Sequence, residues 1–314
     1  MCVVFVCGIA KEIELKRADE EYTMVVMNTI ELAKNKEETK TTLRGLPETL
    51  IQKAPKLRKG QVALVGAGPG DPGLLTLNAL LLIQQAEVVV CDRLVSPEIM
   101  ALRPESAELI NAGKSCKEHV MTQDETNEVL VQQALKGKRV VRLKGGDPYI
   151  FGRGGEEVEF LMAHQIESIV VPGITAASGC SAYAGFPLTH RDFAQSVTFV
   201  TGHRMKDGTL DLDWKAFACE DRTVVFYMGL ANAQLISDNL QAQGRAAETP
   251  VALIERGTTP KQRVVLTNLA ELPNTIQKEG LKPPTMMVVG EVVTLAEKNR
   301  LLAQNLVNQA RQTG

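Results

Sequence analysis

The run Leu143–Glu157 (LKGGDPYIFGRGGEE) combines glycines, bases and acids in an unusual way. It follows Arg139–Leu143, a segment typical of a buried strand. Glycines allow a ligand to approach the backbone closely, and ligand sites in α/β proteins favour loops at the carboxyl ends of parallel strands. A structural loop rarely needs so many glycines beside charged side chains. This run therefore predicts a ligand-binding loop.

A second glycine-rich run, Gly66–Gly73 (GAGPGDPG), also lies between an expected strand and an expected helix. The dinucleotide fingerprint would need a glycine in place of Asp71, and Pro69 and Pro72 lack the amide donors that a pyrophosphate would use. NAD binding is therefore disfavoured. Taken alone, this run fits a tight structural turn as well as a ligand loop.

Three further clusters follow along the chain, and each has a structural alternative. The small residues of Val171–Ser178 (VPGITAAS) suit ligand contact or the close packing of two helices. His190 and Arg191 suit a binding site or an ion pair at the surface. Met228 ends an apolar run at a position where methionine usually fills a core.

The composition disfavours several classes of protein. The 314 residues are 44% hydrophobic and 23% charged with a formal net charge of -2, so no overall field attracts nucleic acid or a membrane surface. The six cysteines and four histidines are irregularly spaced, which predicts free thiols, a cytoplasmic location and no metal site. Met1–Ala10 lacks the flanks of a signal peptide, and no stretch has the ~20 apolar residues of a membrane helix.

Strands and helices that could position these motifs alternate from Gln61 onward, whereas residues 1–59 are charge-rich and lack this pattern. We expect strands at Val62–Gly66, Glu87–Cys91, Ala107–Asn111, Arg139–Leu143, Ser168–Val171, Ser196–Thr201, Thr223–Met228, Val251–Glu255, Arg263–Leu266 and Met286–Val289. We expect helices at Leu74–Ala86, Thr122–Leu135, Gly155–His164, Ala231–Gln243, Pro273–Glu279 and Leu295–Gln312. Helices between buried strands predict layered α/β domains, with a boundary near Pro172–Pro187.

Several long motifs occur in a definite order along the chain. They are VGAGPGDPG at 65–73, DRLVS at 92–96, RLKGGDP at 142–148, VPGITAASG at 171–179, PLTHR at 187–191, TGH at 201–203 and FYMG at 226–229. In this order they resemble the uroporphyrinogen-III C-methyltransferases of the tetrapyrrole methylase family. The resemblance spans about residues 60–300, and an ordered set of motifs is far more specific than a single glycine loop.

The resemblance implies an α/β fold of two α/β domains, residues 60–175 and 176–300, with the active site in the cleft between them, and a homodimer. Residues 1–59 would be an N-terminal arm or linker without an assigned function, and residues 301–314 a C-terminal tail. Some family members carry a dehydrogenase and ferrochelatase module before the methylase. The 59 residues that precede the core are too few for such a module, so we expect either methylase activity alone or a chain trimmed from a longer ancestor.

The resemblance also implies S-adenosyl-L-methionine as the methyl donor, with no metal. Gly66–Gly70 has the shape of an ordinary Rossmann methyltransferase loop, and Asp92 lies where a ribose ligand would be, but this family holds the donor elsewhere. By matching motif, the donor contacts are expected at Pro69, Gly145, Gly146, Asp147, Ile150, Thr175, Ala176, Met228 and Gly257.

The same matching implies Asp92 as proton acceptor, Lys114 as proton donor and Arg142 as a partner for a substrate carboxylate. The implied reaction transfers two methyl groups to adjacent pyrrole carbons, C2 and C7, of uroporphyrinogen III and gives precorrin-2 for sirohaem or cobalamin. The carboxylates of this substrate need basic partners. Candidates are Arg93, Lys114, Arg142, Arg153, Arg191, Lys261 and Arg263.

Three other functions remain open at this point. The first is another tetrapyrrole methylase that acts on a later precorrin. The second is a methyltransferase of the same fold that acts on a protein side chain, which would not need the basic lining. The third is a nucleotide-sensing module without catalysis, which turnover of the methyl donor would distinguish.

Overall fold

The structure is a computed structural model and describes residues 52, 55–113, 121–202, 210–296 and 299. The chain divides into two units, Met1–Gly45 and Leu46–Gly314, and every element described here belongs to the second unit. Lys114, the tail 301–314 and nearly all of the arm before Pro55 lie outside the described residues. Most of the helix expected from Leu295 also lies outside them.

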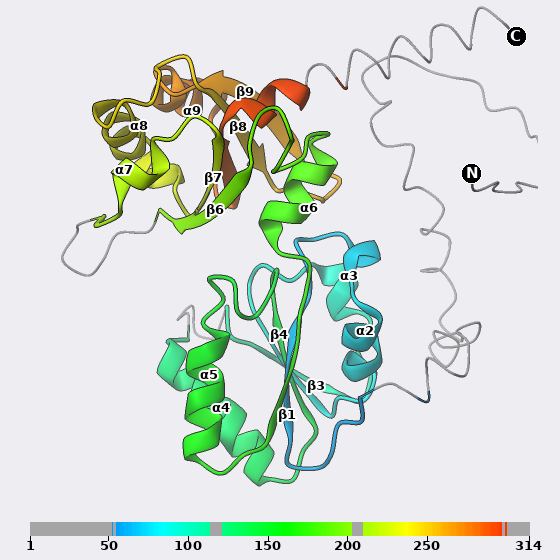
Figure 1. Cartoon of the computed structure of the whole chain (residues 1–314). Helices are drawn as coiled ribbons and strands as arrows, with labels where there is room; N and C mark the ends of the chain where they lie inside the picture. The colour runs from blue at the N-terminus through cyan, green and yellow to red at the C-terminus, as the bar shows by residue number, and fades with distance from the viewer. Residues whose placement is uncertain (1–51, 53–54, 114–120, 203–209, 297–298, 300–314) are drawn as a thin grey trace, which may run out of the picture. The chain divides into compact units, whose positions relative to one another are not determined.

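Within the described residues, the first sheet has five strands, all parallel, in the order β3-β2-β4-β1-β5. Figure 1 labels three of them, β1, β3 and β4. The strands are β1 (Val62–Gly66), β2 (Val88–Cys91), β3 (Glu108–Asn111), β4 (Val140–Lys144) and β5 (Ser168–Val171). Each lies within one residue of the apolar run that predicts it. Continuous apolar runs suit this sheet because helices cover both of its faces.

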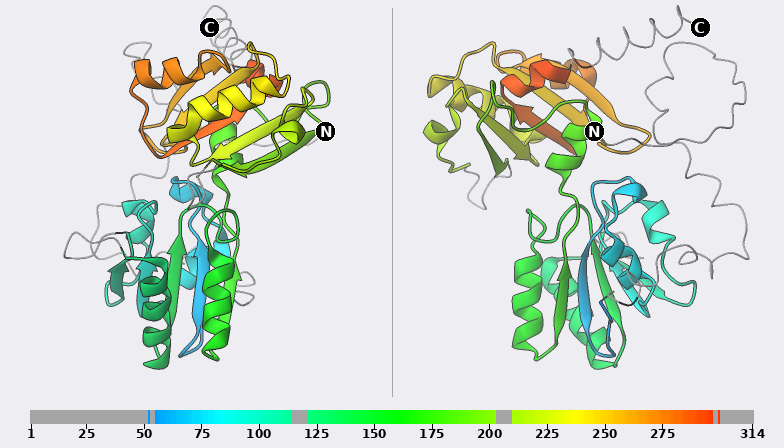
Figure 2. Two further views of the ribbon diagram at one scale, coloured as in Figure 1. Left: turned by 90° about the vertical axis from the view of Figure 1, so that its left-hand side faces the viewer. Right: turned by 45° about the vertical axis from the view of Figure 1, so that its right-hand side comes forward.

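Two helix layers enclose the first sheet (Figures 1 and 2). The helices are α2 (Leu77–Ile83), α3 (Pro97–Met100), α4 (Gln123–Leu135) and α5 (Gly154–Ala163). Leu82 and Ile99, from α2 and α3, pack in one core cluster, whereas Leu130 and Leu161, from α4 and α5, pack in another. The capping box predicted at the start of α4 is confirmed, since Thr122 and Glu125 exchange hydrogen bonds between side chain and backbone.

The second sheet is mixed rather than all parallel. Its order in the described residues is β6-β7-β10-β8-β9, and only β6 and β7 pair in parallel. The strands are β6 (Ser196–Thr201), β7 (Arg222–Tyr227), β8 (Pro250–Glu255), β9 (Arg263–Asn268) and β10 (Thr285–Val289). The accompanying helices are α6 (Ala176–Tyr183), α7 (Trp214–Phe217), α8 (Ala233–Ala242) and α9 (Leu272–Glu279) (Figure 1). The predicted α/β fold class with two α/β domains is therefore confirmed.

Several element boundaries differ from the sequence expectation. The helix expected from Leu74 begins at Leu77, because the Thr76 side chain accepts a hydrogen bond from the Ala79 amide and caps the helix there. Helix α6 was not predicted, since its small residues give no clear apolar period. Leu57, which the sequence places in the arm, is buried in the core of the first domain.

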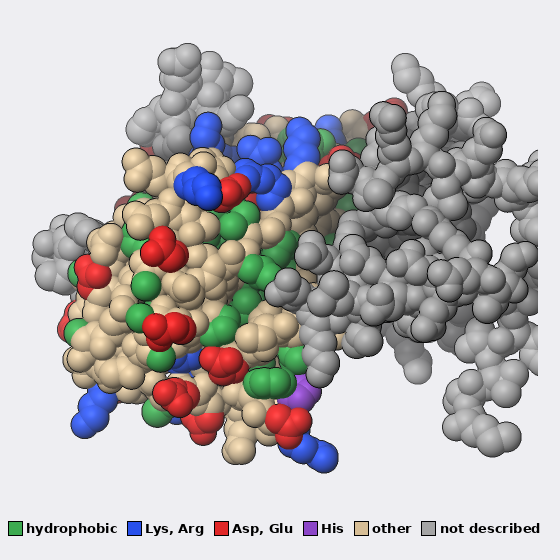
Figure 3. Space-filling model, turned by 90° about the horizontal axis from the view of Figure 1, so that it is seen from above, with side chains coloured by type: hydrophobic (Ala, Val, Ile, Leu, Met, Phe, Trp, Pro, Cys, Tyr) green, Lys and Arg blue, Asp and Glu red, His purple; other side chains and the backbone are tan. Residues whose placement is uncertain are grey.

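The described surface carries local groups of charge although the formal net charge is only -2. On the face shown in Figure 3, basic side chains gather toward the upper edge, and acidic ones are scattered over the rest with hydrophobic side chains between them. Among the helices that the structure describes, none is long and apolar enough to span a membrane.

Candidate functional site

Three loops meet at the carboxyl edge of the first sheet. They follow β1, β4 and β5, which are neighbours in the sheet, so the parallel fold brings their ends together. The amide of Gly68 donates to the carbonyl of Gly146 at 3.1 Å, and the amide of Gly146 donates to that of Gly68 at 2.7 Å. A Cβ on Gly66 would lie 2.4 Å from the Gly173 nitrogen, so glycine is required where these backbones touch.

Asp147 fastens the loop after β4. Its Oδ1 accepts a hydrogen bond from the Tyr149 amide at 2.8 Å, and its Oδ2 accepts one from the Gly173 amide at 3.0 Å. The Ile150 amide donates to the Asp147 carbonyl at 3.3 Å. The loop therefore holds Gly145, Gly146, Asp147 and Ile150, four of the expected donor contacts, in one fixed turn.

The expected donor contacts Thr175 and Ala176 lie at the start of helix α6. Tyr227, at the end of β7, holds this start, since its hydroxyl is 2.5 Å from the Thr175 hydroxyl and accepts a hydrogen bond from the Ala177 amide at 3.0 Å. Burial raises the pKa of Tyr227, so the hydroxyl stays protonated. A Cβ on Gly146 would lie 3.9 Å from the Ala176 nitrogen, which brings the β4 loop close to this helix end.

Pro69 and Gly257 both contact helix α6. A Cβ on Gly179 would lie 2.5 Å from Cγ of Pro69, and one on Gly257 would lie 2.2 Å from Sγ of Cys180. Burial raises the pKa of Cys180 to about 12, so this thiol stays neutral. Five of the expected donor contacts, from both domains, thus lie at or beside one short helix: Pro69, Gly146, Thr175, Ala176 and Gly257.

Met228 does not fill a core. It follows Tyr227, has a φ of 55° and is 54% exposed. Positive φ is strained for a residue other than glycine, and such strain is found at functional sites. The sequence alternative of a buried methionine is therefore wrong, and the thioether is available to a ligand.

Asp92, which follows β2, forms an ion pair with Arg142 in the middle of β4. Nη2 of Arg142 donates to Oδ1 of Asp92, and Nε donates to Oε1 of Glu157 at 3.0 Å. Arg142 is only 3% exposed, whereas the Asp92 side chain is 33% exposed. Burial opposes the charge on Arg142, but the two carboxylates outweigh this effect and raise its pKa. Because each of its side-chain nitrogens already donates to a protein acceptor and the side chain is almost fully buried, Arg142 is poorly placed to bind a substrate carboxylate.

Lys144 and Glu157 also belong to this cluster, and neither is among the site residues predicted from the sequence. Nζ of Lys144 lies 2.9 Å from Oε1 of Glu157 and 3.9 Å from Oδ2 of Asp92. Burial and the neighbouring Arg142 lower the pKa of Lys144. A signal was present in the sequence, because Arg142 and Lys144 alternate within an apolar strand and so must share one buried face. Two cations there require acidic partners.

The other basic candidates differ in their surroundings. Arg153 forms an exposed ion pair with Glu156, and Arg263 pairs with Glu255 and Glu279. Lys114 lies outside the described residues. Within the parts of the chain that the structure describes, no group of three or more His, Cys, Asp or Glu side chains could hold a metal.

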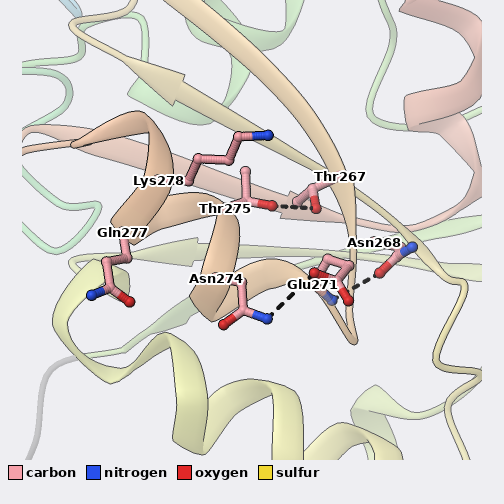
Figure 4. Close-up of a pocket in the computed structure, with 7 residues that line it drawn as sticks. All are labelled: Thr267, Asn268, Glu271, Asn274, Thr275, Gln277 and Lys278. Carbon is pink, nitrogen blue, oxygen red and sulfur yellow. Dashed lines mark hydrogen bonds between the residues drawn. The ribbon is translucent and has the colours of Figure 1, made fainter.

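A separate hollow between β9 and α9 carries none of the expected site residues (Figure 4). It is lined by Thr267, Asn268, Glu271, Asn274, Thr275, Gln277 and Lys278. The Thr267 and Thr275 hydroxyls lie 2.8 Å apart and bond to each other, and Oδ1 of Asn268 accepts from the Glu271 amide. The polar groups of Thr267, Thr275, Asn268 and Glu271 are thus partnered within the hollow, which offers no evident chemistry.

The fold and these loops define an α/β protein of two domains whose candidate ligand contacts gather around the start of α6. A family model of the tetrapyrrole (corrin/porphyrin) methylases matches residues 61–273. The chain therefore belongs to the tetrapyrrole methylase family.

Individual relatives are similar over the same region. A siroheme synthase from Azotobacter vinelandii is 58% identical over 255 residues, which are 81% of this chain and 54% of that protein. The chain thus spans about half the length of the curated relatives that it matches.

Two crystal structures of a uroporphyrin III C-methyl transferase from Thermus thermophilus also match, one native and one in complex with S-adenyl homocysteine. Each has a TM-score of 0.64 and 40% identity and covers 74% of this chain and 93% of the Thermus chain. A cobalt precorrin-4 methyltransferase matches with a TM-score of 0.68 at 26% identity, over 77% of this chain and 99% of that chain.

Proposed function

We propose that this protein is an S-adenosyl-L-methionine-dependent C-methyltransferase that methylates uroporphyrinogen III twice, at C2 and C7, and gives precorrin-2 for sirohaem or cobalamin. The main support for this proposal is the 40% identity to the Thermus uroporphyrin III C-methyl transferase over 93% of that chain. The lower identity of 26% to the precorrin-4 enzyme supports the earlier substrate over a later precorrin.

We propose that the methyl donor lies against the β4 loop and the start of α6. Its contacts would be Pro69, Gly145, Gly146, Asp147, Ile150, Thr175, Ala176, Met228 and Gly257. The residues fit such a ligand, because Gly146 has a φ of 70° and a Cβ added to it would have only the Ala176 nitrogen, at 3.9 Å, within 4 Å among the described atoms outside its chain neighbours. A bound donor supplies a methyl group on a cationic sulfur, and the chain supplies alignment with the ring carbon.

Asp92 is the proposed proton acceptor. Methyl transfer makes a pyrrole ring cationic, and a proton must then leave the macrocycle. A carboxylate that is one-third exposed at the end of β2 can stabilise the developing charge or accept the proton. Lys114 remains the proposed proton donor.

We propose a role for Arg142 other than binding a substrate carboxylate. It holds Asp92, since all three of its nitrogens face protein acceptors: Asp92, Glu157 and, at 3.4 Å, the Val90 carbonyl. The substrate carboxylates would then bind basic side chains such as Arg153 and Arg191, because both are solvent-exposed.

The domain limits, assembly and location are also proposals. The first domain would end at residue 175, immediately before α6 begins at Ala176, and the second would run to residue 300. Residues 1–59 would be an arm and residues 301–314 a tail. We propose a cytoplasmic homodimer that binds neither nucleic acid nor membranes. Light scattering of the purified protein would test the dimeric state.

One assay tests the proposed function. Purified protein is mixed with methyl-labelled donor and uroporphyrinogen III, without added metal or nicotinamide, and the products are weighed by mass spectrometry. We expect a product heavier by two methyl groups. A folded protein that binds the donor but never methylates this substrate would contradict the proposal, and methylation of a later precorrin alone would replace it.

A further inference from the structure

We propose that Glu157, together with Lys144, is a positioning residue that orients Asp92 through Arg142 for the methyl-transfer step. This inference rests on the proposed function, because it assigns Asp92 to that reaction. Glu157 would not touch the substrate. It would act from the buried end of a charged network whose other end, Asp92, is partly exposed.

Glu157 collects hydrogen bonds from two separate elements. It lies in the first turn of α5 and is fully buried. Its Oε1 accepts from Nε of Arg142 at 3.0 Å and Nζ of Lys144 at 2.9 Å, both on β4, and from Nε2 of Gln123 at 3.0 Å, at the start of α4. A buried charge is costly unless it is paired and hydrogen-bonded. One carboxylate oxygen thus fixes two strand cations and the end of a helix.

The network is balanced in charge. Side chains alternate along a strand, so Arg142 and Lys144 leave β4 on the same face. Both are almost fully buried, at 3% and 2% exposure, and their counter-charges are Glu157 and Asp92. Placement in the first turn of α5 also favours the negative charge of Glu157, because the positive end of the helix dipole lies there.

The planar guanidinium of Arg142 connects the two carboxylates, so the position of one determines the position of the other. Glu157 binds Nε of Arg142, and Asp92 accepts from Nη2 of the same group. A guanidinium presents its donors in a rigid fork, so fixing one side fixes the direction of the other. Glu157 therefore sets the orientation in which Asp92 faces the proposed substrate.

The charged neighbours define what a change at Glu157 would do. Lys144 faces Arg142 on its own strand, Glu157 on α5 and Asp92 after β2. Arg153 and Glu156 pair with each other at the surface of α5, where they also act on this network at longer range. Removal of the Glu157 charge leaves two buried cations beside one carboxylate. Excess positive charge makes neighbouring groups lose protons at lower pH.

Glu157→Gln tests the proposal because it keeps the shape and removes only the charge. We expect affinity for S-adenosylhomocysteine to stay within about twofold, and kcat to fall roughly 10- to 10²-fold because the reacting groups are misaligned. The pH profile of kcat should move to lower pH. The double variant Lys144→Gln/Glu157→Gln restores the charge balance, so its pH profile should return to that of the wild type, with kcat recovering in part.

Glu87→Gln is the matched control, since Glu87 pairs with Arg139 beside the amino ends of β2 and β4. It should leave kcat and the pH profile unchanged. A folded Glu157→Gln protein with wild-type kcat and pH profile overturns the proposal. Equal losses of kcat in the single and double variants with an unmoved pH profile also overturn it, because that result indicates a structural role alone.

An NMR titration of the Lys144 amine separates this inference from the proposed function. It needs no substrate, and Glu157→Gln should lower the pKa of Lys144 further. If the wild-type protein does not methylate uroporphyrinogen III, the proposed function fails, and an unchanged Lys144 titration would independently overturn the network. If the single variant does not fold, the charge-balanced double variant decides, and wild-type kcat in that variant overturns the proposal.

Discussion

The Tyr183 hydroxyl donates a hydrogen bond of 2.7 Å to Oδ2 of Asp71 and so joins the end of α6 to the turn after β1. The Asp71 amide in turn donates to Oγ1 of Thr258, in the loop after β8, at 3.2 Å. Three segments that also carry the expected donor contacts Pro69, Thr175 and Gly257 are thereby connected. Burial and the Asp71 carboxylate raise the pKa of Tyr183 to about 12.

Tyr183→Phe should alter stability most clearly as a function of pH. Near neutral pH the lost hydrogen bond should lower the free energy of unfolding by about 0.5–1.5 kcal/mol. Because the folded pKa of Tyr183 is raised from 10.0 to about 12, its contribution is complete below pH 10 and is lost as the pH rises through about 12. The difference between wild type and variant should therefore shrink above pH 10.

Urea unfolding at a series of pH values measures this effect, and Tyr149→Phe, at a tyrosine that is 57% exposed, is the control. The control should cost little at any pH. If the loss of unfolding free energy in Tyr183→Phe stays constant across the alkaline range, folding does not raise the pKa of Tyr183.

Asp92→Asn should spare donor binding and slow turnover. Asp92 can be interpreted as a ribose ligand, a proton acceptor or an ion-pair partner. Under each interpretation the variant loses a different property: donor affinity, turnover or stability. We expect near-normal affinity for S-adenosylhomocysteine and a loss of turnover of roughly 10²-fold or more if Asp92 is a general base. The melting temperature should also fall, because Arg142 and Lys144 lose a counter-charge.

Calorimetry with S-adenosylhomocysteine and a methyl-transfer assay well below the melting temperature separate these effects. Asp238→Asn is the control, at an exposed carboxylate on α8 that accepts a hydrogen bond from Gln234. Loss of donor affinity in Asp92→Asn would favour the ribose interpretation. A lower melting temperature with full turnover would leave Asp92 as a structural ion-pair partner.

Gly146→Val should weaken donor binding sharply. The space beside Gly146 opens toward the Ala176 nitrogen, and a branched side chain would occupy it. Gly137→Val is the matched control, since Gly137 has a φ of 74° against 70° for Gly146 and no atom within 4 Å of its added Cβ. Both variants carry a similar backbone penalty, so only the Gly146 variant should lose affinity in calorimetry. Equal affinities in two folded variants would contradict this donor placement.

The sequence predicts local structure well here and side-chain partnerships poorly. The apolar run Val62–Gly66 and the capping box at Thr122 each suffice, because neighbouring residues determine a strand and a helix start. The mixed order of the second sheet depends on pairing between distant strands, such as β10 between β7 and β8, and apolar runs alone do not encode it.

The site shows the same division between local and distant information. Motif order predicts which loops carry the expected contacts, because a glycine loop is a local feature. The ion-pair partners of Arg142 could not be predicted from its own motif, since Glu157 lies in the next helix and Asp92 follows a neighbouring strand. A charged residue within an apolar strand was the available signal, and it identifies a buried ion pair as readily as a ligand contact.

Deletion of residues 1–51 should leave folding and methyl transfer intact, whereas deletion of residues 1–58 should destabilise the protein. Leu57 is 5% exposed in the first core, and its amide donates to Oε1 of Gln85 at 3.0 Å. Nε2 of Gln85 donates in turn to the Pro55 carbonyl at 3.0 Å. Burial of a leucine side chain contributes about 1.5–3 kcal/mol, so the longer deletion should lower the free energy of unfolding by about 2 kcal/mol or more.

Urea unfolding and the methyl-transfer assay measure both effects, and Leu57→Ala in the full chain is the control for the lost packing. Equal stability of the two truncated proteins would show that Leu57 adds nothing, and a soluble but inactive protein lacking residues 1–51 would place part of the site in the arm.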